Sequence, residues 1–101
     1  MYKIFETKEA KRDKKIILKS YPKVTQKKLE YFVADILSAP RNKNTVGCPE
    51  ELKHGRVELW SSELTPKDRI VYGIEPGMNY DMPEEKEIIV FYQYSGHYQD
   101  K

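Results

Sequence analysis

The chain has 101 residues, which is the size of one domain with a single modest hydrophobic core. Hydrophobic residues make up 39% of the chain, charged residues 34% and aromatic residues 12%, a composition that excludes a disordered tail protein. No apolar run approaches the roughly 20 residues that span a bilayer, no segment resembles a signal peptide, and the lone Cys48 excludes an internal disulfide. We therefore expect one cytoplasmic domain over residues 1–101 that does not interact with a membrane.

Positive charge is concentrated towards the N-terminus. Residues 1–28 contain ten Lys and Arg against three acids, a net charge of +7, whereas residues 29–101 carry −5. Such a stretch can bind a phosphate backbone by displacing its counterions, but a solvated helix face is the commoner explanation of a lysine-rich helix.

The N-terminal elements are predicted from periodicity and capping residues. Residues 2–6 alternate and indicate a short strand. Thr7 can then cap a helix that runs to about Ser20, and Pro22 ends that helix.

A second helix is predicted to begin at Thr25 and to stop before Pro40. Its apolar residues recur at i, i+3, i+4, i+7 and i+8, namely Leu29, Phe32, Val33, Ile36 and Leu37. This is the clearest amphipathic helix in the sequence.

The period changes to two after the loop predicted over residues 41–55. Residues 56–64, 69–74 and 87–94 are predicted to be strands, with a long acidic hairpin loop over 75–86. The order is then β-α-α-β-β-β, which predicts an α+β fold whose two N-terminal helices pack on one face of an antiparallel sheet. The other face would be open, and polar residues there are candidates for chemistry.

The candidate chemistry rests on isolated polar residues, because no established metal, nucleotide or catalytic-triad motif is present. Two histidines and one cysteine do not favour a zinc site. Glu50, Arg69 and His97 together supply a base, a cation and an imidazole, the set that RNA cleavage by internal transfer requires. His97 and Tyr98 taken alone are also consistent with a solvated chain end.

Four short motifs in order resemble the YoeB/Txe family of toxins in the RelE superfamily. They are Pro49-Glu50-Glu51-Leu52-Lys53, Trp60-Ser61, Arg69-Ile70-Val71-Tyr72 and His97-Tyr98. The resemblance extends over roughly residues 25–98 and is weaker before residue 25. It implies the same compact fold of two helices on an antiparallel sheet.

The resemblance also implies an activity, that of a ribosome-dependent endoribonuclease that cuts mRNA. Glu50 would be the general base towards the 2′-OH, Arg69 would stabilise the scissile phosphate, and His97 would be the general acid. Tyr98 would position the phosphate or stack on a base. No metal and no other cofactor is implied, because the nucleophile is the 2′-OH of the substrate.

The implied partners are a cognate antitoxin, the ribosome and mRNA, with the chain in a toxin–antitoxin complex or a homodimer. Lys53 would assist in phosphate binding, and we predict that Lys11, Arg12 and Lys15 of the basic first helix contact ribosomal RNA.

The sequence departs from the family pattern at several places, and two of them lie close to the candidate site residues. Glu63 stands where the family usually has a basic residue, and Ser95-Gly96 stands where an arginine is usual. Glu51 competes with Glu50 for the role of base. The alternatives left open are a non-catalytic relative that binds RNA or the ribosome, and one that binds a DNA topoisomerase.

Overall fold

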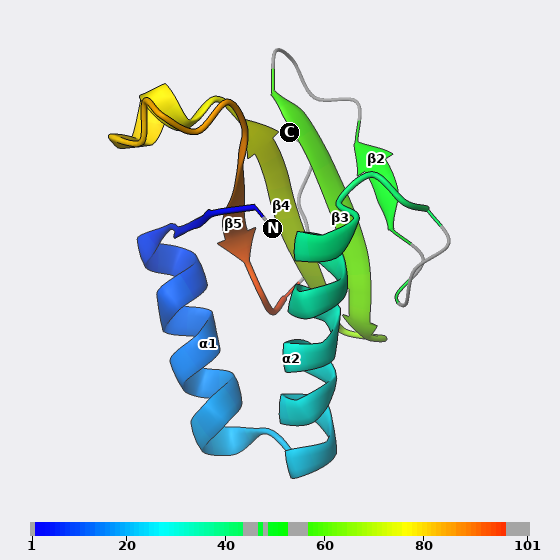
Figure 1. The fold of residues 1–101 in the computed structure, drawn as a ribbon. Helices are drawn as coiled ribbons and strands as arrows, with labels where there is room; N and C mark the ends of the chain where they lie inside the picture. The colour runs from blue at the N-terminus through cyan, green and yellow to red at the C-terminus, as the bar shows by residue number, and fades with distance from the viewer. Residues whose placement is uncertain (1, 44–46, 48, 53–56, 97–101) are drawn as a thin grey trace.

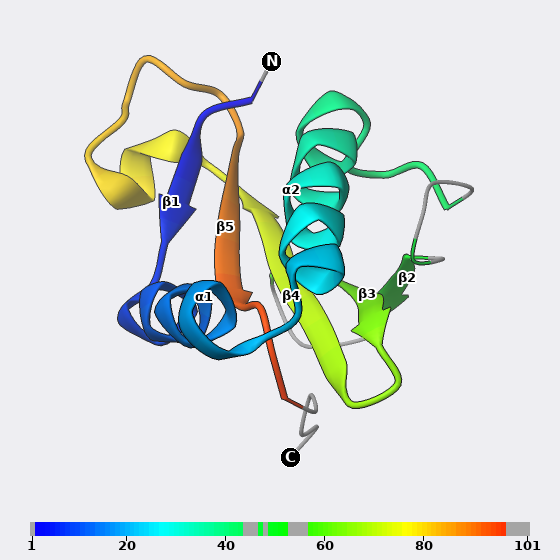
Figure 2. The same ribbon diagram turned by 90° about the horizontal axis from the view of Figure 1, so that it is seen from below.

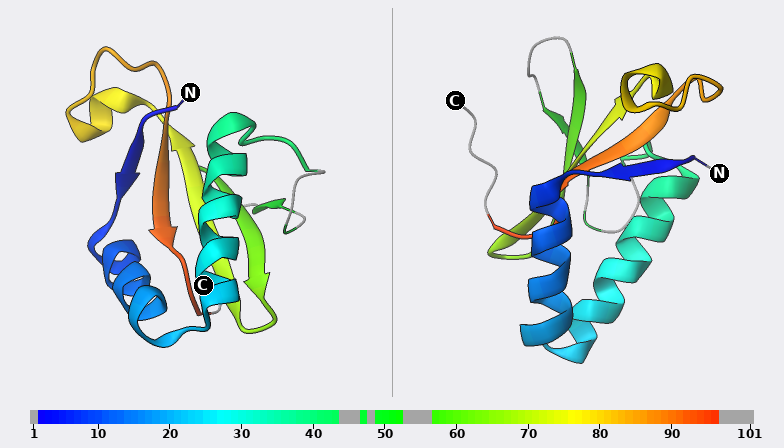
Figure 3. Two further views of the ribbon diagram at one scale, coloured as in Figure 1. Left: turned by 60° about the horizontal axis from the view of Figure 1, so that its bottom comes forward. Right: turned by 90° about the vertical axis from the view of Figure 1, so that its left-hand side faces the viewer.

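A computed structural model of the chain describes residues 2–43, 47, 49–52 and 57–96 (Figure 1). Its elements, in chain order, are β1 (Ile4–Glu6), α1 (Lys8–Ser20), α2 (Lys23–Ser38), β2 (Glu50–Leu52), β3 (Glu58–Thr65), β4 (Asp68–Glu75), the short 3-10 helix η1 (Gly77–Tyr80) and β5 (Ile88–Gln93). The predicted α+β class is confirmed, with both helices following a short first strand and packing on one side of a five-stranded sheet (Figures 2 and 3). No helix within these described ranges is both long and apolar enough to cross a membrane.

The sheet has the strand order β1-β5-β4-β3-β2 and is mixed, which corrects the wholly antiparallel sheet that we predicted. Strands β2, β3, β4 and β5 pair antiparallel, but β1 pairs parallel to β5, with Ile4 opposite Ile89. The cause lies at Thr7, whose N–H donates to the carbonyl of Phe91 and whose hydroxyl donates to the carbonyl of Tyr92. Thr7 follows β1 directly and is bound near the C-terminal end of β5. The C-terminal ends of the two strands therefore lie together, and the pair is parallel.

The helix starts show one correct and one wrong prediction. Thr7 caps α1 as predicted, and its hydroxyl accepts a hydrogen bond from the N–H of Ala10. Helix α2 begins earlier than the predicted start at Thr25, because the carbonyl of Pro22 accepts hydrogen bonds from the N–H groups of Thr25 and Gln26. Proline suits that position because the first N–H groups of a helix have no intrahelical acceptor.

The two segments predicted as loops contain short regular elements. Residues 50–52 form the edge strand β2, and residues 77–80 of the acidic loop form η1. Three-residue strands have too few side chains to show a period, so the pairing with β3 decides the conformation of β2.

The hydrophobic core lies between the helices and the sheet. Of the five apolar residues predicted on α2, Leu29, Phe32 and Ile36 are buried and Val33 and Leu37 pack partly buried against them. They meet side chains that project from one face of the strands, including Trp60, Leu64, Ile70, Tyr72, Ile74, Ile89 and Phe91. Side chains alternate along a strand, so the intervening residues point to the other face of the sheet, which we call the outer face.

One end of the outer face is covered by the segment between β4 and β5 (Figure 3). The ring of Tyr80 lies 4.7 Å from that of Phe5 on β1. The hydroxyls of Tyr80 and Tyr92 both donate to the buried carboxylate of Glu75. Exposed polar side chains on the outer face therefore gather at the other end, on β2, β3 and β4.

Candidate active site

Arg69 is at the centre of a polar cluster on the outer face. The antiparallel register places Glu63 directly opposite Arg69 and places Glu50 opposite Ser61. The Arg69 guanidinium donates from Nε to Ser61 Oγ, its Nη2 lies 3.5 Å from Glu50 Oε1, and its Nη1 lies 3.8 Å from Glu63 Oε1. Three adjacent strands thus bring together one cation, one hydroxyl and two carboxylates.

The accessibility of these groups suits a site that takes its ligand from solution. The side chain of Arg69 is 26% exposed, whereas those of Glu50 and Glu63 are 68% and 56% exposed. Ion pairs with such exposed partners are worth little, because water and salt screen them. An incoming phosphate can therefore displace a carboxylate from Arg69 at low cost while Ser61 continues to orient the guanidinium.

The register also separates the two candidate bases. Glu50 is opposite Ser61 and so points to the outer face, where it meets Arg69. Glu51 is opposite Trp60, whose indole is buried in the core on the helix side of the sheet. Of the two carboxylates, Glu50 is therefore the one placed beside Arg69.

The chain is held against β4 as far as Gly96. The N–H of Arg69 donates to the carbonyl of Gly96 over 2.9 Å, and the N–H of Gly96 donates to Asp68 Oδ1 over 2.8 Å. The backbone that leads into His97 therefore passes next to Arg69. His97, Tyr98 and Lys53 themselves lie outside the described residues.

The basic residues of the first helix do not line this cluster. Lys11, Arg12 and Lys15 are exposed on α1, in the helix layer, whereas Glu50 and Arg69 lie on the outer face. If they bind RNA, they bind it away from Arg69, and the predicted contact with ribosomal RNA stays a prediction.

Three residues of this region were missed by the reasoning from sequence. Ser61 orients Arg69, and Asp68 and Asp13 accept hydrogen bonds from the backbone that precedes His97. Asp68 stands between two predicted strands, just after Pro66 and Lys67, and no local signal distinguishes a turn aspartate there from one that anchors a distant segment. The same carboxylate accepts from the hydroxyl of Tyr21, and burial together with this hydrogen bond raises the pKa of that tyrosine.

Residues 2–43, 47, 49–52 and 57–96 offer no candidate metal site. Within that part of the chain, no group of three or more His, Cys, Asp or Glu side chains is arranged to hold a metal ion.

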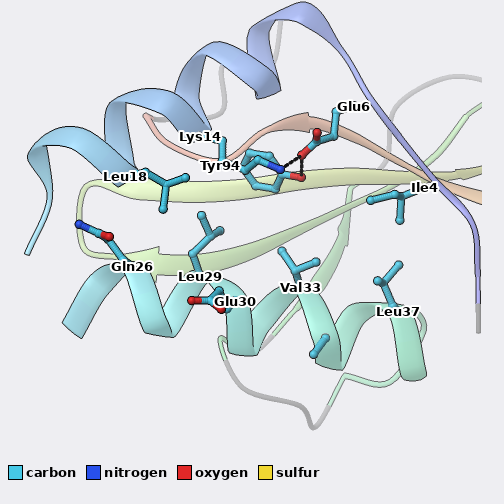
Figure 4. Close-up of a pocket in the computed structure, with 11 residues that line it drawn as sticks. Ile4, Glu6, Lys14, Leu18, Gln26, Leu29, Glu30, Val33, Leu37 and Tyr94 are labelled. Atoms are coloured by element: carbon cyan, nitrogen blue, oxygen red, sulfur yellow. Dashed lines mark hydrogen bonds and ion pairs between the residues drawn. The ribbon is translucent and has the colours of Figure 1, made fainter. Parts of the chain in front are cut away.

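A second feature is an apolar groove between α1, α2 and β1, with a volume of about 430 Å³ (Figure 4). Its aliphatic lining residues are Ile4, Leu18, Leu29, Val33 and Leu37. At one wall Tyr94 Oη and Lys14 Nζ both donate to Glu6 Oε2, over 2.5 Å and 2.9 Å. Burial by itself would raise the pKa of Glu6, but these two hydrogen bonds and the positive charges of Lys14 and Lys11 together outweigh it and lower the pKa.

Comparison with solved structures shows that the chain has the fold of YoeB/ParE-type toxins. A YoeB/ParE toxin from Agrobacterium tumefaciens is 21% identical and superimposes with a TM-score of 0.75, over 95% of this chain and 99% of that one. The YoeB dimer from Staphylococcus aureus is 21% identical, with a TM-score of 0.73 over 96% and 98% of the two chains. A chain of the heterotetrameric YoeB-YefM toxin-antitoxin complex from the same organism is 21% identical, with a TM-score of 0.70 over 97% of this chain and 99% of that one.

These likenesses confirm the resemblance to YoeB-type toxins at the level of the fold. In sequence, no protein-family profile and no curated protein matches the chain. At identities near 21%, the likeness covers the fold and does not extend to the activity, the site residues or the partners.

Proposed function

We propose that this chain is the toxin of a type II toxin–antitoxin system and that it cleaves mRNA on the ribosome as a metal-independent endoribonuclease. The proposal rests on the fold shared with YoeB-type toxins and on the polar cluster around Arg69. Its site of action would be the cytoplasm, where the ribosomes are.

The proposed reaction uses four side chains of the chain and the 2′-OH of the substrate. Glu50 takes the proton of the 2′-OH, and the 2′-oxygen attacks the adjacent phosphorus. Arg69 stabilises the charge that develops on the phosphate oxygens. The P–O5′ bond breaks, the leaving oxygen takes the proton of the His97 imidazolium, and Tyr98 positions the phosphate.

The observation that carries the proposal is the placement of Glu50 and Arg69. Both lie on the outer face within 3.5 Å of each other, although 19 positions apart in the sequence, and the backbone leading to His97 is hydrogen-bonded to Arg69. A base and a phosphate-binding cation at this separation can contact the 2′-OH and the phosphate of one nucleotide. Exposure of both side chains leaves the phosphate a path to Arg69.

The first experiment compares induced expression of the wild type with Arg69→Ala and His97→Ala. We expect growth arrest and mRNA cleavage in the wild type only, because each substitution should lower the rate of cleavage by about 10²–10³-fold. Lys67→Ala is the matched control, because it removes an exposed cation from the turn two residues before Arg69. Purified protein should cut mRNA bound to 70S ribosomes much faster than the same RNA free in solution.

The result also separates the alternatives. Equal toxicity of all the variants would end the nuclease proposal and would direct attention to inhibition of a DNA topoisomerase. Binding to ribosomes without any cleavage would indicate a non-catalytic RNA-binding relative. Cleavage of free RNA at the ribosomal rate would retain the nuclease and remove the ribosome dependence.

The second part of the proposal is an antitoxin partner, which the YoeB-YefM complex supports. We infer that an acidic, amphipathic segment of the antitoxin occupies the groove between α1, α2 and β1. The groove is apolar, and α1, which forms one of its walls, carries six Lys and Arg against two acids, so an acidic segment matches both properties.

This part is tested with the protein encoded by a short acidic reading frame next to the gene. Leu18→Glu places a charge in the groove and should weaken binding of that protein at least about tenfold while leaving toxicity intact. Val24→Glu is the control, because Val24 is exposed on α2 outside the groove. If Leu18→Glu instead converts a dimer to a monomer, the groove is the contact between two copies of the chain.

A further inference from the structure

Two aspartates hold the segment that leads into His97. The N–H groups of Tyr94 and Ser95 donate to Asp13 Oδ2 over 3.1 Å and 3.4 Å, and the N–H of Gly96 donates to Asp68 Oδ1 over 2.8 Å. Three consecutive backbone N–H groups thus bind carboxylates from α1 and from the start of β4. Charge-assisted hydrogen bonds of this kind are about twice as strong as neutral ones.

Asp68 is itself fixed in place. It is only 6% exposed, and besides the Gly96 N–H it accepts from the hydroxyls of Tyr21 and Thr65, over 3.0 Å and 2.7 Å. It is also the residue directly before Arg69 on β4. The carboxylate is therefore a rigid point of attachment one residue from the proposed phosphate-binding cation.

The carbonyl side of the same peptide is held as well. The carbonyl of Gly96 accepts from the N–H of Arg69 over 2.9 Å and from Gln93 Nε2 over 3.2 Å. Gln93 Nε2 also donates to the carbonyl of Arg69 over 3.1 Å. Gly96 has a positive φ of 85°, which glycine adopts without strain, and both of its backbone groups are bound.

We propose that Asp68, with Asp13, is a positioning residue that holds the backbone of Gly96 beside Arg69 and so delivers His97 to the leaving 5′-oxygen. The inference rests on the proposed function. The first two residues of β4 then carry both roles, because Arg69 binds the phosphate and Asp68 positions the general acid.

The test measures single-turnover cleavage of ribosome-bound mRNA by the wild type, His97→Ala and Asp68→Ala. Misplacing a catalytic group by about 1 Å can cost about 10²-fold in rate, so Asp68→Ala should lower the rate of the chemical step by roughly 10- to 100-fold and leave the KM unchanged. Asp68→Asn keeps an oxygen acceptor for the Gly96 N–H and should restore most of the rate. Tyr21→Phe is the matched control, because it removes another hydrogen bond of the same carboxylate and leaves the Gly96 contact in place.

A second substrate separates positioning of the acid from general damage to the fold. The substrate is an RNA in which sulfur replaces the scissile 5′-oxygen. Its leaving group is a thiolate, which needs no proton from the enzyme. On this RNA, His97→Ala and Asp68→Ala should both cleave at nearly the wild-type rate, whereas Arg69→Ala should still cleave more slowly. A defect of Asp68→Ala that persists on the sulfur substrate would overturn the proposal.

The remaining outcomes are also decisive. A fully active Asp68→Ala beside an inactive His97→Ala would refute the positioning role and leave the nuclease proposal standing. An inactive wild type, or a fully active His97→Ala, would refute the proposed function itself. If Asp68→Ala does not fold, Asp13→Ala replaces it, because Asp13 is a half-buried residue on α1 and its loss frees the Tyr94 and Ser95 N–H groups.

Discussion

The two faces of the sheet show a clear division between stability and chemistry. The face covered by the helices carries Tyr72 and Phe91, both fully buried and surrounded by other core residues. The outer face at β2, β3 and β4 carries Glu50, Glu63 and Arg69, which are exposed or half-exposed and charged. The same sheet builds both faces, because successive side chains alternate along each strand.

The candidate site therefore requires little of the core beyond a rigid strand register. Glu50 meets Arg69 because β2 pairs with β3 and β3 with β4, and those pairings depend on the buried side chains of the helix-covered face. Changes on that face should therefore act on folding, whereas changes on the outer face should act on cleavage or on RNA affinity.

The largest effect is expected from Phe91→Ala on the helix-covered face. Removing a fully buried phenylalanine from β5, an inner strand of the sheet, should lower the free energy of unfolding by about 3–5 kcal/mol. Urea denaturation measures it, with Val24→Ala, at a site 73% exposed on α2, as a control expected within about 0.5 kcal/mol of wild type. A small effect of Phe91→Ala would mean that the helix-covered face is not the core.

The next effect is expected on the outer face, from Glu50→Gln. Loss of the proposed base should reduce ribosome-dependent cleavage by about 10²-fold at unchanged stability. Glu51→Gln makes the same change in the adjacent residue, whose strand position points to the opposite face. Equal losses in the two variants would contradict the assignment of the base to Glu50.

A smaller, pH-dependent effect is expected from Glu6→Gln on the helix side. The hydrogen bonds from Tyr94 and Lys14 lower the pKa of Glu6 in the folded chain below its ordinary value of 4.5. A carboxyl with a lowered folded-state pKa stabilises the fold above its ordinary pKa, and that contribution is lost as the pH falls through the lower value.

At pH 7 Glu6→Gln should therefore be less stable than wild type by about 1 kcal/mol, and the difference should shrink towards pH 3. Denaturation curves at both pH values measure this, with the exposed Glu84→Gln as the control. A difference that does not change with pH would show that Glu6 acts through its shape and not through its charge.

The smallest effect, and one of opposite sign, is expected from Glu63→Gln on the outer face. Glu63 lies 3.8 Å from the Arg69 guanidinium, so it competes with the substrate phosphate for that cation. Its neutralisation should lower the KM for ribosome-bound mRNA by a few-fold, about the worth of one exposed ion pair, while Glu50→Gln lowers the rate. A fall in rate for Glu63→Gln would instead make Glu63 part of the catalytic machinery.

Much of the fold could be predicted from the sequence because its signals are local. The apolar spacing on α2 identified a helix and three of its buried residues, and alternation identified the three long strands. The motifs around Glu50 and Arg69 could be recognised as candidates for the same reason. The strand β2 and the parallel pairing of β1 were not predicted, because each depends on a partner distant in the chain. The start of α2 was placed too late, because Thr25 was taken as the cap although the carbonyl of Pro22 accepts the first hydrogen bonds of the helix.

Local signals in the sequence thus predict the α+β class, the order of the longer elements, and Glu50 and Arg69 as candidates for chemistry. The pairing of the strands brings these two side chains together on one face and directs Glu51 to the other. The packing of the whole domain likewise places Asp13 and Asp68, which lie 81 and 28 positions from their backbone partners, where they hold the chain as far as Gly96. The physical reason is that periodicity and capping act within a few residues, whereas register and hydrogen bonding between distant segments follow from how the whole core packs.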